Sequence, residues 1–126
     1  MAYLLDSDVL IDISRSRQAA IDYVDALPDI WSISQVTAME LLVGARDKRE
    51  VGFLHVFLSA YPIVPLRDSF GSRAYRLLME YSKSHGLPVF DSLIAATALE
   101  EGLTLVTRNR RHFAMIDGLM LRVPGY

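Results

Sequence analysis

The chain has 126 residues, 52% of them hydrophobic, which is enough material for a single domain with one core, residues 1–126. It contains no cysteine, which excludes disulfides, thiolate metal sites and cysteine nucleophiles. The formal net charge of -2 argues against a protein that coats nucleic acid non-specifically, so any nucleic-acid contact must be local.

Hydrophobic periodicity predicts strands that alternate with helices along the whole chain. Strands are expected at 2–5, 30–33, 62–65, 103–106 and 120–123, and helices from 9, over 18–26, from 34 toward 44, and over 51–58, 68–84 and 91–101. Ser7 or Asp8 is expected to cap the first helix, and Gly86 and Gly102 to close the last two. The alternation predicts an α/β fold in which helices flank both faces of a central, mostly parallel sheet, a three-layer α/β/α arrangement.

Acidic and amide side chains recur where the strands of this predicted sheet end. In chain order they are Asp6, Asp8, Glu40, Asp91 and Asn109, and Asn109 is preceded by the hydroxyl residue Thr107 directly after the fourth strand. The carboxyl ends of parallel strands share one edge of the sheet, and ligands usually bind there. We therefore expect three carboxylates, from Asp6, Glu40 and Asp91, and the amide of Asn109 to converge.

Converging carboxylates need compensation, because two of them ~5 Å apart repel by roughly 3 kcal/mol at an effective dielectric of about 20. Such a cluster must bind a cation, bind a basic partner or raise a pKa. Oxygen ligands without cysteine favour a hard ion, so Mg²⁺ is the expected cofactor and Mn²⁺ a substitute. The three histidines lack the short spacing of a zinc motif.

Several of these residues have a simpler alternative. Asp91 could be a helix N-cap, Asn109 a turn residue and Thr107 a hydroxyl bonded to backbone, while Asp8 suits a cap or a supporting role better than direct ligation. Beside Asn109 lies the densest basic cluster of the chain, Arg108, Arg110 and Arg111. These arginines could meet RNA phosphates at the active edge, or belong to a solvated loop.

Four segments together resemble a known family. They are Leu4 to Ile11 (LLDSDVLI), Met39 to Ala45 (MELLVGA), Phe90 to Ala98 (FDSLIAATA), and Leu105 to Asn109 (LVTRN) with His112-Phe113. In this order they resemble the PIN-domain ribonucleases and, more narrowly, VapC-type toxins of toxin–antitoxin pairs. The resemblance covers essentially the whole chain and implies a PIN-like fold.

The resemblance also implies roles for particular residues. Asp6, Glu40 and Asp91 match the metal-binding acids of the family, and Asn109 occupies the position of a fourth residue that is often acidic. Asn109 keeps an oxygen but loses a charge there, which puts a second metal site in doubt. Asp8 stands where the family commonly carries Asn, and so adds an acid near the same pocket.

A ribonuclease toxin is expected to act in the cytoplasm as a homodimer that a cognate antitoxin covers, and to hydrolyse RNA with a metal-activated water that Thr107 and Asn109 help to position. Consistent with this location, no apolar run approaches the roughly 20 residues of a membrane span, and we see no export segment.

Two rival functions stay open on the sequence alone. The run Asp6-Ser7-Asp8 after an apolar strand also suits a haloacid-dehalogenase-type phosphatase, but that chemistry uses a downstream Lys, and no Lys follows Lys83. The acidic pocket could instead bind an Arg of a partner in a non-catalytic interaction module. Dependence on a divalent metal would separate the nuclease from that module.

Overall fold

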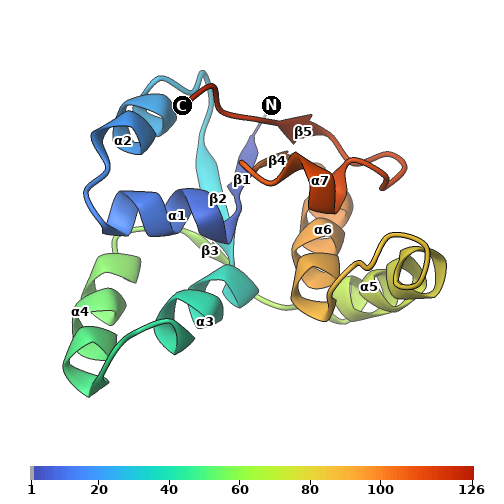
Figure 1. Ribbon diagram of the computed structural model, residues 1–126, viewed down its shortest axis with the longest axis horizontal. Coiled ribbons are helices and arrows are strands. Elements are labelled where there is room, and N and C mark those ends of the chain that lie inside the picture. Colours follow the sequence, from blue (N-terminus) through green and yellow to red (C-terminus); the bar gives the residue numbers. More distant parts are fainter. Residues whose placement is uncertain (1) are drawn as a thin grey trace.

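A parallel sheet with helices on both sides forms the molecule (Figure 1); the computed structural model describes residues 2–126. The strands are β1 (Tyr3–Leu5), β2 (Trp31–Ser34), β3 (Ile63–Val64), β4 (Thr104–Val106) and β5 (Leu121–Arg122). The helices are α1 (Ser7–Ser14), α2 (Gln18–Asp25), α3 (Gln35–Val43), α4 (Lys48–Leu58), α5 (Asp68–Tyr81), α6 (Val89–Glu101) and α7 (Arg110–Phe113).

The strand order is β3-β2-β1-β4-β5, and every pairing is parallel, which confirms the predicted fold class. β1 lies at the centre, where Leu5 is in register with Ile33 of β2 and with Val106 of β4. From β1 the chain adds β2 and β3 on one side and then β4 and β5 on the other. Because all of these strands are parallel, the carboxyl ends of β1, β2 and β4 lie at the same edge of the sheet. This is the edge at which open parallel sheets bind ligands.

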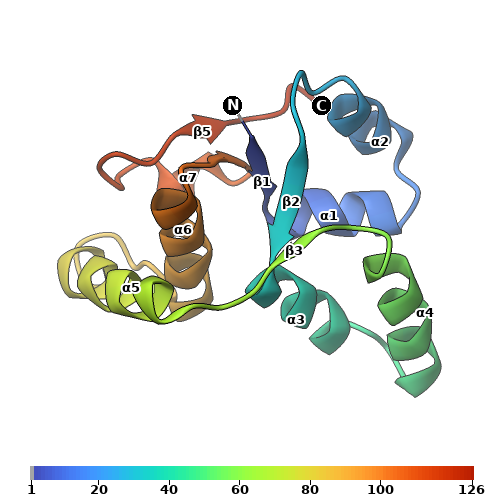
Figure 2. The same ribbon diagram turned by 180° about the vertical axis from the view of Figure 1, so that it is seen from behind.

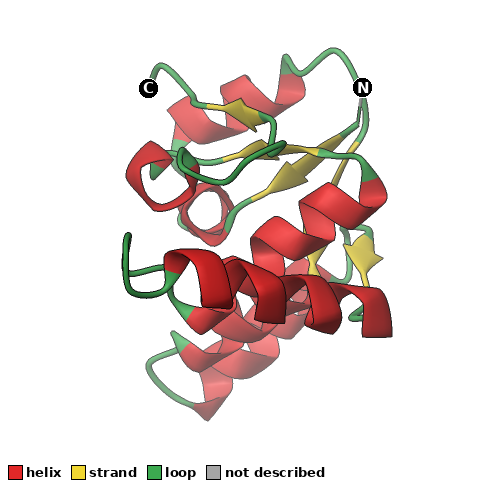
Figure 3. Ribbon diagram, turned by 90° about the vertical axis from the view of Figure 1, so that its right-hand side faces the viewer, coloured by secondary structure: helices red, strands yellow, loops and turns green. Residues whose placement is uncertain are grey.

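Two hydrophobic cores cover the two faces of the sheet. Leu4 and Leu105 pack with buried residues of α5 and α6, whereas Leu5 and Val106 pack with those of α1, α2 and α4. Neighbouring residues of a strand point to opposite faces, so each short strand contributes to both cores. Figure 2 shows α1, α2 and α4 on one side of the strands and α5 and α6 on the other, and Figure 3 views the molecule from the side of α5.

Several helix boundaries differ from the prediction. Asp6, and not Ser7 or Asp8, is the N-cap of α1, because its extended backbone and its carboxylate bond to Ser7 N start the helix at Ser7, two residues earlier than predicted. α6 begins at Val89 after Pro88, so Asp91 lies in the first turn and is not the cap. A proline at the cap fixes the backbone dihedral angle φ there, which allows the helix to start before the acid.

Further along the chain, α4 starts at Lys48 behind an Asp47 cap, earlier than its apolar positions indicated, and α5 ends at Tyr81, before the predicted residue 84. The short helix α7 was not predicted. Gly102 closes α6 in the left-handed conformation with φ of 65°, as expected. Within residues 2–126, no helix is both long and apolar enough to cross a bilayer.

Candidate functional site

Asp6 is the buried centre of the candidate site, with only 6% of its surface exposed. It follows β1, and both of its carboxylate oxygens are held: Ser7 N donates to Oδ1 and Thr107 Oγ1 donates to Oδ2, each at 2.8 Å. Thr107 follows β4, which is the neighbour of β1, so the pairing of the two strands brings these side chains together. The Thr107 hydroxyl therefore bonds to a carboxylate and not to backbone oxygen.

The Asp6 carboxyl is costly to ionise where it lies. Burial, followed by the charge of Asp8, raises its pKa to about 7, while the hydrogen bonds from Thr107 and Ser7 act in the opposite direction. The charge of Asp91 adds a smaller increase. Asp6, Asp8 and Asp91 thus share one electrostatic environment, in which a cation would relieve the repulsion.

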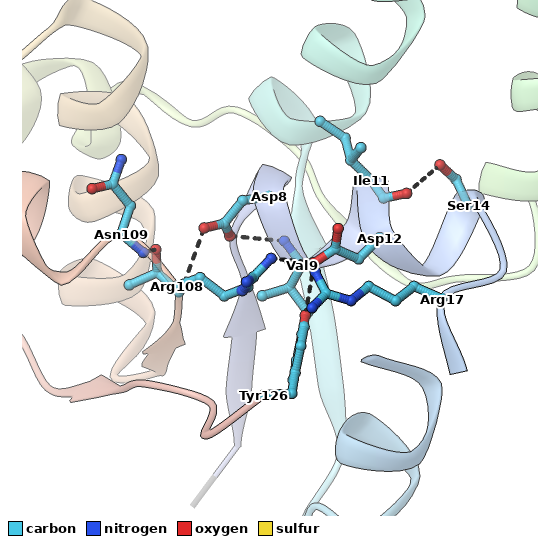
Figure 4. Close-up of polar contacts among 10 residues, drawn as sticks. Asp8, Val9, Ile11, Asp12, Ser14, Arg17, Arg108, Asn109 and Tyr126 are labelled. Atoms are coloured by element: carbon cyan, nitrogen blue, oxygen red, sulfur yellow. Dashed lines mark hydrogen bonds and ion pairs between the residues drawn. The ribbon is translucent and has the colours of Figure 1, made fainter. Parts of the chain in front are cut away.

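Asp8 binds main-chain donors with both of its oxygens. Oδ1 accepts from Val9 N at 2.7 Å and Oδ2 accepts from Arg108 N at 3.0 Å (Figure 4). Burial raises the pKa of Asp8 as well, although these two hydrogen bonds oppose that shift. The contacts tie the start of α1 to the segment after β4, which suits a supporting role for Asp8 better than direct ligation.

Asn109 lies in that same segment, at the N-cap position of α7. Its side chain makes no capping hydrogen bond, whereas its main-chain N–H donates to Thr107 Oγ1 at 3.0 Å. The Thr107 hydroxyl consequently joins Asp6 to Asn109. The amide side chain of Asn109 is left available to a ligand at this edge of the sheet.

Asp91 reaches the site from the first turn of α6, a helix that is buried along most of its length. Its Oδ2 lies 2.8 Å from Nδ1 of His112 on α7. The side chain of Asp91 is 18% exposed and that of His112 46%, so the pair lies at the rim of the site. His112 is the side-chain partner that orients this acid.

Glu40 reaches the same edge from α3. Ser7 Oγ donates to Glu40 Oε1 at 2.6 Å and also lies 3.3 Å from Thr37 Oγ1, so the first turn of α1 is tied to α3. Ser7 directly follows Asp6, so its hydroxyl links Glu40 to the segment that carries the buried acid. Glu40 is half-buried, in a helix whose buried residues include Val36, Ala38 and Leu41.

The donor set fits a hard cation in its chemistry, although the acids are not yet gathered around one point. Within residues 2–126, no three His, Asp or Glu side chains form a group that could hold a metal ion in the conformations described. Asp91 and Glu40 are instead bonded to His112 and Ser7.

The predicted RNA-contacting arginines fall into two groups. Arg110 and Arg111 are exposed on α7, the helix that carries His112. Arg108 is held instead, because its guanidinium donates to Asp12 at 3.0 Å. The sequence did not predict this contact, nor those of Ser7 with Glu40 and His112 with Asp91, since each joins segments far apart in the chain.

A groove of about 740 Å³ leads away from the site between α1, α3 and α4. Of the predicted acids, only Glu40 lines it. Ile11, Leu41 and Leu54 contribute apolar surface to it. The charged residues that line the rest of it are Arg15, Arg46, Asp47, Arg49 and Glu50.

The sequence pattern of the PIN-domain family matches residues 3–119 of this chain. The chain belongs to that family. Ribonuclease VapC10 of Mycobacterium tuberculosis is 38% identical to it over 130 aligned residues, which cover 98% of this chain and 96% of that protein. Within the PIN-domain family the chain therefore belongs with the VapC ribonucleases, which confirms the resemblance drawn from its sequence and places it among nucleases.

Solved structures of toxin–antitoxin complexes also match the fold of this chain. A toxin–antitoxin complex from Klebsiella pneumoniae matches with a TM-score of 0.78 and 31% identity, over 97% of each chain. VapBC2 from Rickettsia felis, bound to a DNA fragment from its promoter, matches with a TM-score of 0.81 and 26% identity, over 98% of each chain. These matches favour neither a phosphatase nor a non-catalytic module.

Proposed function

We propose that this chain is the toxin of a VapBC-type pair and hydrolyses RNA phosphodiester bonds with Mg²⁺ held by its acidic site. PIN-domain VapC nucleases are metal-dependent, and the choice of Mg²⁺ follows from the all-oxygen donor set. The observation that carries the proposal is the buried Asp6, whose pKa is raised to about 7 by burial and by neighbouring acids. A bound cation would stabilise the ionised form of such a carboxylate more than that of an exposed one.

In this proposal Asp6 and Asp91 bind the ion directly, and Glu40 binds it directly or through water. When bound, the ion would acidify a water for attack on the phosphate and stabilise the charge that develops there. Thr107 holds Asp6 in a single orientation through its 2.8 Å hydrogen bond. His112 and Ser7 hold Asp91 and Glu40 at the rim.

Asn109 would bind a water or a phosphate oxygen with its amide, which has no capping partner. It contributes no charge, so the acids of this edge are Asp6, Glu40 and Asp91, with Asp8 already bound to the main-chain N–H groups of Val9 and Arg108. This arrangement suits one tightly held ion better than two.

The partners that we propose are a cognate antitoxin and a second copy of the chain. The groove between α1, α3 and α4 has apolar and charged lining of both signs, which fits a peptide segment, and Glu40 lines it, so an antitoxin bound there would cover this acid. Met39, Val43, Tyr75 and Met79 are exposed apolar residues on α3 and α5 that would be covered in a homodimer. Residues 1–126 would act as a single PIN-like domain in the cytoplasm.

The test is incubation of total cellular RNA with the purified, partner-free protein in Mg²⁺, in Mn²⁺ and in EDTA. We expect discrete fragments with either metal and intact RNA in EDTA. Intact RNA under all three conditions would contradict the proposal and favour the non-catalytic module, which should bind its partner equally well in EDTA.

A further inference from the structure

Two arginines from opposite ends of the chain lie beside the acidic site and share one carboxylate. Asp12 Oδ2 accepts from Arg108 Nη1 at 3.0 Å and lies 3.6 Å from Arg17 Nη1. The phenol of Tyr126 donates to the same oxygen at 3.0 Å. Asp12 therefore accepts hydrogen bonds from Arg108 and Tyr126 and forms an ion pair with Arg17. We call Arg17 and Arg108 the arginine pair, and these four residues together the cluster.

The tyrosine ring fixes both guanidinium groups. The central carbon of each guanidinium lies 4.8 Å from the centre of the Tyr126 ring. Figure 4 shows the ring between the two arginine side chains. Each contact is a cation–π interaction, which holds a planar cation without using its N–H donors. Burial and the neighbouring Asp12 raise the pKa of Tyr126, so its hydroxyl stays protonated and adds no negative charge.

Arg17, Arg108, Asp12 and Tyr126 together carry one more positive than negative charge, and the carboxylate of Asp8 also interacts with Arg108. One carboxylate faces two guanidinium groups, and each guanidinium has five N–H donors, most of them unused by Asp12. The Asp12 side chain is only 17% exposed, whereas Arg17 and Arg108 are 44% and 35% exposed. The anion is inside and the open donors face solvent, which is the arrangement of a site for an external anion.

The position of the cluster identifies that anion. Asp12 lies one turn beyond Asp8 on α1, about 6 Å along the helix axis. The main-chain N–H of Arg108 is bonded to Asp8, whose charge in turn raises the pKa of Asp6. An RNA strand with one phosphate at the acidic site would therefore pass its neighbouring phosphates along α1 toward the arginine pair.

We propose that Arg17 and Arg108, held in place by Tyr126 and Asp12, form a subsite that binds a phosphate of the RNA strand near the phosphodiester that is cut. The inference rests on the proposed function, since it takes RNA as the substrate. It assigns binding roles to Arg17 and Arg108 and positioning roles to Asp12 and Tyr126. The exposed Arg110 and Arg111 are not required for it.

The experiment measures binding separately from cleavage. A 5′-fluorescein-labelled, mixed-sequence RNA of twelve nucleotides is titrated in EDTA, and fluorescence anisotropy gives the dissociation constant at several KCl concentrations. Arg17→Gln, Arg108→Gln and the double variant are compared with Arg76→Gln, which removes a charge from the exposed face of α5.

We expect each single variant to make the plot of log K against log salt less steep by about 0.7 and to weaken binding about fivefold at 0.1 M salt. The double variant should change the slope by about 1.4 and the affinity by about 25-fold. Arg108→Lys should keep the slope and still bind more weakly, because a lysine keeps the charge but loses the forked contact. Arg76→Gln should change neither quantity. Arg17→Gln leaves the Arg108–Asp12 bond intact, so it keeps the test valid if the double variant is unstable.

An unchanged slope in both single variants, with RNA still bound, would overturn the subsite and leave the nuclease proposal standing. Absence of RNA binding by the wild-type protein in EDTA would overturn the subsite, while cleavage of total RNA in Mg²⁺ decides the nuclease proposal separately. Normal, arginine-dependent binding together with intact RNA in Mg²⁺ would support the subsite and contradict the cleavage proposal alone.

Discussion

Replacement of Asp6 by Asn should stabilise the metal-free protein at neutral pH, even though it removes the central acid of the site. The folded-state pKa of Asp6 is about 7, against an ordinary value of 3.8. At 1.36 kcal/mol per pKa unit, ionising this buried carboxylate costs roughly 4 kcal/mol of folding free energy above pH 7. An amide avoids that cost.

The sign follows from the proton balance. Between about pH 4 and pH 7 the folded protein keeps a proton on Asp6 that the unfolded chain has lost, so stability falls as the pH rises through this window. Below pH 4 both states are protonated and Asp6 has no effect. An Asn can still bond to Ser7 N and Thr107 Oγ1, although the reversed hydroxyl costs about 1 kcal/mol. The net gain should be about 3 kcal/mol at pH 8 and close to zero or negative at pH 4.

Urea unfolding at pH 4, 6 and 8, in EDTA and in 10 mM Mg²⁺, measures this directly. The wild-type protein should gain about 1.4 kcal/mol from Mg²⁺ if the ion is present at ten times its Kd, and Asp6→Asn should gain almost nothing. A variant whose effect on stability does not change between pH 4 and pH 8, or that still responds fully to Mg²⁺, would refute the reasoning.

Three other substitutions follow from the structure. Thr107→Val should weaken Mg²⁺ binding and raise the pKa of Asp6 further, because the hydrogen bond that it removes favours the carboxylate. Thr107→Ser keeps the hydroxyl and should have neither effect. The Mg²⁺-induced thermal shifts of the two variants measure the difference. Gly102→Ala should lower stability by about 1 kcal/mol in urea unfolding, since φ is 65° there. Phe113→Ala should cost about 3–5 kcal/mol in the same assay, because this ring is only 1% exposed, and retention of near-wild-type stability would contradict the packing described.

The position of the site could be predicted because it depends on strand order and on local pattern. Asp6 and Thr107 both end buried strands, and the parallel pairing of β1 with β4 then brings them into contact whatever the details of the connecting helices. Asp91 also precedes a run of small and apolar residues, and most of the run from Ser92 to Ala98 is buried in α6. Local composition and the alternation of elements were sufficient for these features.

The side-chain partners could not be predicted, because they depend on how helices pack. Ser7 and Glu40 are separated by 33 residues and meet only because α1 packs beside α3. Tyr126 reaches Asp12 across 114 residues. At the start of α1, the N-cap is Asp6 and not the predicted Ser7 or Asp8, because several neighbouring side chains can accept from the same N–H groups.

The central claim is that Asp91 acts in metal-dependent cleavage of RNA and not in folding. It is tested most directly by comparing the cleavage of total RNA in Mg²⁺ by wild type, Asp91→Asn and a matched control, Asp117→Asn, whose carboxylate is exposed in the loop after α7. We predict that Asp91→Asn abolishes cleavage while keeping its Tm near that of wild type, and that Asp117→Asn cuts normally. A folded Asp91→Asn protein that cleaves RNA at the wild-type rate would contradict the account.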